Sequence, residues 1–148
     1  KQGLLQEILI TNSRQLEEEL REAVSRKGDI PTTLYRVARA YFDFAENHRK
    51  FYMFMLSQFY AGRETEGFRA VYPLIRKYYQ LVVQIFADAS QELGNMGGRQ
   101  EQFAISFIGI LDSHMMLAFR DLSEEKSVTI SDEQTYEIVR QFLYGIYS

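Results

Sequence analysis

The chain has 148 residues, of which 46% are hydrophobic and 25% are charged, and its formal net charge is −3 at pH 7. This length and composition are typical of one globular domain with its own core, and they exclude disordered, collagen-like and low-complexity chains. The chain has no cysteine, which excludes disulfides and thiolate chemistry, and no basic cluster that would mark a nucleic-acid surface, so we expect a cytoplasmic protein without a membrane segment.

Two residue counts need an explanation. The chain has only two prolines, which permits long helices, and it has 10 Tyr and 11 Phe with no Trp. So many aromatic side chains exceed what a small core usually needs. The excess predicts either a cavity that these rings line or a second surface that they bury.

The apolar spacing at the start of the chain is helical over about 2–26, and Gly28 and Asp29 mark the break before the next helix. No N-cap residue precedes this first helix. Its first half also carries extra apolar residues outside the main stripe, namely Leu4, Ile8 and Ile10. We therefore expect this helix to pack on a segment that precedes it.

Three further helices are predicted over about 31–47, 49–61 and 66–93. In the first two, the apolar arc covers more than half of the helix surface, which is wider than a one-sided surface helix requires. The third contains Pro73, but its polar stripe keeps phase across the proline, so we predict a kink there rather than a helix start. Its inward face is predicted to hold Phe68, Val71, Tyr72, Ile75, Tyr79, Val82, Val83 and Phe86.

The last two helices are predicted over about 99–120 and 132–147, the second opening with a capping box from Ser131 to Gln134. The helix over 99–120 is apolar over about 200° of its circumference. Beside that arc lies a row of small residues, Ser106, Gly109 and Ser113. These residues either form a packing groove within the chain or let a partner helix approach closely, and the wide apolar surfaces of both helices favour a partner. Six helices without any strand pattern predict an all-α bundle, one domain over 1–148.

The sequence contains no recognisable catalytic or metal-binding pattern. A di-iron bundle needs a Glu-x-x-His pair on each of two helices, but the residues three positions before His48 and His114 are Ala45 and Leu111. No phosphate-binding loop, dinucleotide fingerprint or nucleophile elbow occurs. We therefore expect no enzyme activity, no metal and no cofactor.

Two polar residues each allow two interpretations. His114 lies on the apolar arc of its predicted helix, so it is either a core imidazole bonded to a neighbouring helix or a polar anchor for a ligand in a cavity. Asn12 poses the same choice in the first helix. The arcs that face inward carry no clear carboxylate or arginine, so the expected ligand is small, apolar and flat.

A family resemblance is carried by KQGLLQEIL at 1–9, FIGILDSHMM at 107–116 and EIVRQFLYGIYS at 137–148, with a looser match in RVARAYFDFAENHRKFYMFML at 36–56. These segments resemble the C-terminal ligand-sensing and dimerisation domain of the tetracycline-repressor (TetR/AcrR) family of bacterial transcriptional regulators. The resemblance implies a six-helix bundle whose last two helices form a four-helix interface in a homodimer. The family's N-terminal helix-turn-helix is not in this sequence and is expected upstream, so this chain alone should not bind DNA.

The resemblance also places candidate site residues. The effector pocket would lie among the earlier helices and the penultimate one, with these residues: Tyr41, Met55, Phe59, Tyr79, Phe107 and Met115, and His114 and Asn12 as candidate polar contacts. The dimer interface would include Gly109, Ser113, Leu117, Val139, Phe142 and Ile146.

The function that follows from the resemblance is regulatory. A small apolar effector would favour one arrangement of the domain and so change DNA binding by the intact protein, most simply a repressor. The alternative is a stand-alone helical module that binds a lipid, a small molecule or a protein and has no DNA role. The coding sequence upstream of Lys1 distinguishes the two, because a helix-turn-helix there favours the regulator.

Overall fold

The computed structural model describes residues 2–94, 96–120 and 129–147, and within these ranges the chain forms seven α-helices and one 3₁₀ turn without any strand. The elements are α1 (Gln2–Ser25), α2 (Ile30–Asn47), α3 (Arg49–Phe59), α4 (Glu66–Asp88), α5 (Ser90–Leu93), α6 (Gln100–Arg120), α7 (Asp132–Tyr144) and the 3₁₀ turn Gly145–Tyr147. The all-α prediction is confirmed. Most of the predicted loop over 121–130 lies outside the described residues.

The helix ends follow the local cap signals. Asp29 caps α2 by accepting a hydrogen bond from the Thr32 amide, and Ser131 and Gln134 form the capping box expected at the start of α7. Thr65 caps α4 well before Pro73, so the helix continues through the proline as predicted.

The structure corrects the predicted count of six helices. The segment predicted as one helix over 66–93 is divided at Ala89 into α4 and the one-turn α5, which Gly94 then ends. The last α-helix ends at Tyr144 rather than near 147, because Gly145 follows with φ 70° and the chain tightens into a 3₁₀ turn. Glycine accepts this left-handed backbone without the steric penalty that a side chain imposes.

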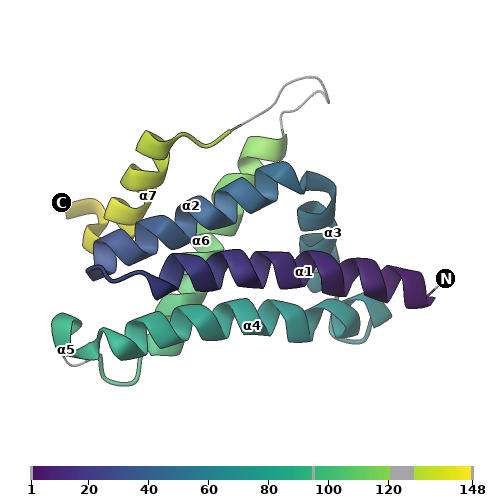
Figure 1. The fold of residues 1–148 in the computed structure, drawn as a ribbon, viewed down its shortest axis with the longest axis horizontal. Helices are drawn as coiled ribbons and strands as arrows, with labels where there is room; N and C mark the ends of the chain where they lie inside the picture. Colours follow the sequence, from purple (N-terminus) through teal and green to yellow (C-terminus); the bar gives the residue numbers. More distant parts are fainter. Residues whose placement is uncertain (1, 95, 121–128, 148) are drawn as a thin grey trace.

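Three long helices, α1, α2 and α4, run side by side along the long axis of the molecule, and α6 crosses behind them (Figure 1). The short α3 stands steeply at the end nearest the N-terminus, where it packs on α2 and α4. Helix α7 packs on α2 at the other end. This arrangement encloses a core between α2, α3, α4 and α6.

Helix α6 is central to that core. Its inward face is almost entirely shielded from solvent and consists of Ala104, Phe107, Ile108, Leu111, Asp112, Met115 and Phe119. By length and composition alone, α6 over Gln100–Phe119 is the one helix of the described part that is apolar enough to cross a membrane. A core helix of a bundle needs the same composition, and the packing of its inward face is that of a core helix.

Candidate functional site

One carboxylate lies inside the core. Asp112 on α6 is only 6% exposed, and its Oδ1 atom accepts hydrogen bonds from the phenol groups of Tyr41 at 2.5 Å and Tyr52 at 2.7 Å. Tyr41 comes from α2 and Tyr52 from α3, so three helices meet at one oxygen atom. The two tyrosine rings contact each other edge to face, with their centroids 5.9 Å apart.

Burial raises the pKa of Asp112 from its ordinary value of 3.8 to about 6, although the hydrogen bonds from Tyr41 and Tyr52 oppose the rise. Desolvation favours the neutral carboxylic acid, whereas phenol donors favour the charged carboxylate. Burial, followed by the nearby negative charge, raises the pKa of the Tyr41 and Tyr52 phenols. At neutral pH the cluster therefore holds a mainly ionised carboxylate and two neutral phenols.

Asp112 lies on the wall of a small internal cavity. The cavity has a volume of about 20 Å³, which is enough for about one water molecule. Seven aromatic side chains line it: Tyr41, Phe44, Phe51, Tyr52, Phe59, Tyr78 and Tyr79. Part of the aromatic excess in the sequence is thus gathered around one buried charge.

Four of the eight residues predicted for the ligand site line this cavity, namely Tyr41, Met55, Phe59 and Tyr79. Phe107 and Met115 are fully buried on α6, where they fill the core beside the cavity. The Asn12 amide donates a hydrogen bond to the Ile8 carbonyl on its own helix and does not line the cavity.

His114 lies elsewhere, because it is exposed and lines a groove between α6 and α7. It follows Asp112 by two residues, which is about 200° around a helix, so only one of the two can face the core. That residue is Asp112. The expectation that the inward arcs carry no carboxylate is therefore wrong, and so is the interpretation of His114 as a core imidazole, because His114 is exposed. Its interpretation as a ligand contact stays a prediction, and the groove that it lines is not the Asp112 cavity.

Sequence reasoning missed Asp112 and Tyr52. The signal for Asp112 was present, since it is the only charged residue in an apolar stretch of α6 that runs from Phe103 to Phe119. A charge in such a stretch either points to solvent or has buried partners. Its partners are phenols on other helices, which no spacing within the sequence reveals.

Tyr52 gives a direct test of this cluster. In Tyr52→Phe the carboxylate loses one of its two hydrogen-bond donors while the ring is kept, so the pKa of Asp112 should rise further. The titration of the Asp112 carboxyl carbon, followed by ¹³C NMR, measures the change. Tyr79→Phe is the matched control, because Tyr79 lines the same cavity without donating to Asp112. An equal pKa in Tyr52→Phe and the parent would contradict the geometry.

The residues predicted for a dimer interface divide into two groups. Ser113, Leu117 and Ile146 are exposed, with Leu117 58% and Ile146 84% accessible, and Gly109 is partly exposed. The other two face the interior, since Val139 is 3% exposed and the ring of Phe142 packs on Phe107, with centroids 5.1 Å apart. The groove between α6 and α7 has a volume of about 590 Å³.

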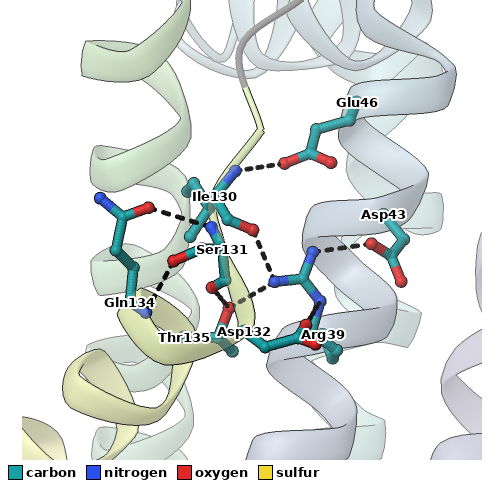
Figure 2. A network of polar contacts seen from close by, with 8 residues as sticks. All are labelled: Arg39, Asp43, Glu46, Ile130, Ser131, Asp132, Gln134 and Thr135. Atoms are coloured by element: carbon teal, nitrogen blue, oxygen red, sulfur yellow. Dashed lines mark hydrogen bonds and ion pairs between the residues drawn. The ribbon is translucent and has the colours of Figure 1, made fainter.

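A polar network joins α2 to the start of α7 (Figure 2). Arg39 donates hydrogen bonds to the Ile130 carbonyl and to Thr135 Oγ1, both at 2.6 Å, and forms ion pairs with Asp43 and Asp132. Glu46 accepts a hydrogen bond of 2.7 Å from the Ile130 amide. Two turns of α2 therefore hold both backbone polar groups of Ile130, just before the Ser131 cap.

No three His, Asp or Glu side chains in the described ranges gather as they would to hold a metal ion.

No protein-family model matches the chain, and no curated protein matches its sequence.

Proposed function

We propose that this chain is the effector-sensing and dimerisation domain of a bacterial transcriptional regulator, in which a small molecule in the Asp112 cavity alters the arrangement of a homodimer. The observation that carries the proposal is that α6 faces a cavity on one side and solvent on another. Asp112 points into an aromatic cavity, and Leu117, about 140° further around the helix, is exposed. The resemblance of 1–9, 107–116 and 137–148 to the tetracycline-repressor family supports the same interpretation.

The outer side of α6 fits a second copy of the chain. Large apolar side chains are exposed there, with Ile105 at 54% and Met116 at 40%, and beside them an added Cβ at Gly109 would meet no atom within 4 Å. No contact with the described residues therefore requires a glycine in the middle of this helix, where glycine weakens helix stability by about 1 kcal/mol. In this proposal, the close approach of a partner helix explains why position 109 is a glycine. In this proposal, α6 and α7 of two copies form a four-helix interface about a twofold axis.

The inner side of α6 fits a sensing cavity that opens when it binds an effector. A cavity of about 20 Å³ is too small for an effector, so in this proposal binding requires a more open arrangement of the residues that line it. The effector shifts the balance between the two states by its preference for the open one. The rings of Phe51, Phe59 and Tyr79 are only partly buried, which makes them the wall that moves.

The first half of α1 fits a contact with a DNA-binding domain. Four large apolar side chains are at least 45% exposed there, namely Leu4, Leu5, Ile8 and Ile10. In the proposed regulator these residues pack against the helix-turn-helix domain, which makes all contacts with DNA. The coding sequence upstream of Lys1 tests this step, because an unrelated domain there would favour a stand-alone helical binding module.

The dimer has its own test at Gly109. Gly109→Arg places a charged side chain where the partner helix is proposed to lie, so the variant should sediment as a monomer at a concentration where the parent is a dimer. An added Cβ at Gly109 meets no atom of the described residues within 4 Å, so the fold should be kept. Gln80→Arg adds the same charge at an exposed position of α4 and should stay dimeric. A dimeric Gly109→Arg protein would move the interface elsewhere.

A further inference from the structure

We propose that the effector of this cavity is an organic cation with an aromatic body, held by the Asp112 carboxylate and the rings around it. This inference rests on the proposed sensing function and names the chemical class of its ligand. It replaces the apolar ligand expected from the sequence, and it depends on three features of the cavity.

The first feature is an unbalanced charge. No Lys, Arg or His is among the residues that line the cavity, and none of the described residues forms an ion pair with Asp112. Asp112 Oδ1 accepts its hydrogen bonds from two phenols, and both of these groups are neutral. A buried carboxylate without a counter-ion is unfavourable, so a ligand that brings a positive charge gains an interaction that the protein itself does not supply. A ligand anion would be repelled from the same site.

The second feature is the set of rings. The face of an aromatic ring is electron-rich and attracts a cation placed over it. Tyr41, Tyr52, Phe59 and Tyr79 approach Asp112's cavity from α2, α3 and α4, so they surround a group bound at the carboxylate on several sides. An aromatic cation uses both properties, since its charge pairs with Asp112 and its flat body stacks on the rings.

The third feature is the contrast with the larger groove between α6 and α7. That groove is lined by Arg99 and His114 together with the rings of Phe86, Phe103 and Phe142, and none of its described lining residues is Asp or Glu, so a cation there lacks the carboxylate partner that Asp112 offers. Its volume of about 590 Å³ exceeds that of the Asp112 cavity, but it lies on the face assigned to the second subunit. By volume alone, the groove is the better candidate for a ligand site. For a cation, the Asp112 cavity is the better candidate, because it contains a carboxylate.

The experiment compares two ligands of the same shape, 1-methylquinolinium and 1-methylnaphthalene, which differ by one positive charge. Both are titrated into the protein labelled with ¹³C at its methionine methyl groups, because Met55 lines the cavity and Met96 lines the larger groove between α6 and α7. Binding in the cavity should shift the Met55 resonance more than that of Met96, and binding in the groove should do the reverse.

Asp112→Asn removes the charge and keeps an oxygen for the two phenols. The affinity of 1-methylquinolinium should fall about tenfold in this variant, whereas that of 1-methylnaphthalene should stay within about twofold. Asp88→Asn removes a charge from the exposed side of α4 and should change neither affinity. Methyl spectra of each free variant show whether it is folded.

The unmodified protein provides a second arm that needs no variant. The titratable groups that face Asp112 are the phenols of Tyr41 from α2, Tyr52 from α3, Tyr60 directly after α3, and Tyr79 from α4, all with a raised pKa. Below about pH 6 the carboxyl is therefore the group that changes its charge. Binding of 1-methylquinolinium should weaken as the pH falls through this range, and binding of 1-methylnaphthalene should not.

The outcomes separate the two proposals. If both ligands bind at Met55 but respond equally to Asp112→Asn and to pH, the cavity is a sensor and its charge selectivity is disproved. If neither ligand shifts Met55, the inference that the cavity binds an aromatic cation is disproved, whereas the sensing function is not, because it specifies no ligand class. The inference is supported if both Asp112→Asn and low pH weaken the binding of 1-methylquinolinium and leave that of 1-methylnaphthalene unchanged.

Discussion

The stability of an Asp112→Asn variant should rise relative to the parent by about 3 kcal/mol between about pH 4 and about pH 8. The folded state raises the pKa of Asp112 from 3.8 to about 6 because burial disfavours the charged form. A group with a raised folded pKa stabilises the protein below its ordinary pKa, and that stabilisation is lost as the pH rises through the folded value. The difference between the two pKa values corresponds to about 3 kcal/mol.

Urea unfolding at a series of pH values measures this effect. Other carboxyl groups titrate in the same range, but they are common to both proteins and cancel when the two curves are subtracted. The subtracted curve should be flat below about pH 4 and should rise mainly between about pH 4 and about pH 6. Asp88→Asn, at an exposed position, should give a flat curve throughout. Parallel curves for Asp112→Asn and the parent would show that Asp112 is not desolvated as described.

Replacing Arg39 with Met should lower the free energy of unfolding by about 2 to 3 kcal/mol. The side chain of Arg39 is only 17% exposed, and its hydrogen bonds to the Ile130 carbonyl and to Thr135 fix the beginning of α7. Thr135 has no accessible surface, so its hydroxyl finds no water when the guanidinium is gone. Met keeps an unbranched apolar side chain but lacks the guanidinium, which in the parent lies over the Phe42 ring at 6.0 Å from its centroid.

The ion pairs of Arg39 should contribute much less than these hydrogen bonds. Asp43 and Asp132 are 56% and 82% exposed, and exposed ion pairs contribute little. Asp43→Asn is therefore the matched control and should cost no more than about 1 kcal/mol. In Arg39→Met, amide hydrogen exchange should accelerate first in α7. Equal losses for the two variants, or faster exchange spread over all helices, would contradict the assigned role of Arg39.

The helices could be predicted from the sequence wherever the signal is local. Asp29 and Ser131 mark helix starts through their own side chains, and α2 and α7 begin directly after them. The break expected around Gly28 is present, but α1 ends earlier, at Ser25. The division of α4 from α5 at Ala89 was not predictable, because Ala89 carries no cap signal. The apolar pattern continues across it, and periodicity therefore indicates one helix.

The orientation of residues at the edge of an apolar face could not be read from spacing alone. Tyr72 was expected to face inward and is 40% exposed, whereas Tyr78, absent from the predicted face, is 4% exposed and donates a hydrogen bond to the Ser13 carbonyl. A wide apolar arc does not say which of its margins meets a neighbouring helix. That choice depends on α1, which is distant in sequence.

The candidate site shows the same limit. Tyr41, Met55, Phe59 and Tyr79 were placed from the family resemblance, and the structure brings them together around one cavity. The polar centre differs, because Asp112 rather than His114 faces the core. The four-residue spacing of Arg39 and Asp43 within one helix is enough to predict their ion pair, but the hydrogen bonds from Arg39 to Ile130 and Thr135 join residues 91 and 96 positions apart.

The two sides of α6 have a consequence for how a signal would travel. An α-helix is only about 10 Å across, so Asp112 and Leu117 are attached to opposite edges of one stiff rod. If the rod turns or slides when the cavity fills, its outer edge moves by the same amount at the same moment, and no relay of side-chain contacts is required. The response of such a protein would depend on the freedom of a single helix to turn. The sensitivity of the protein to its effector would then depend on residues that contact neither the ligand nor the partner subunit but that restrict the rotation of α6.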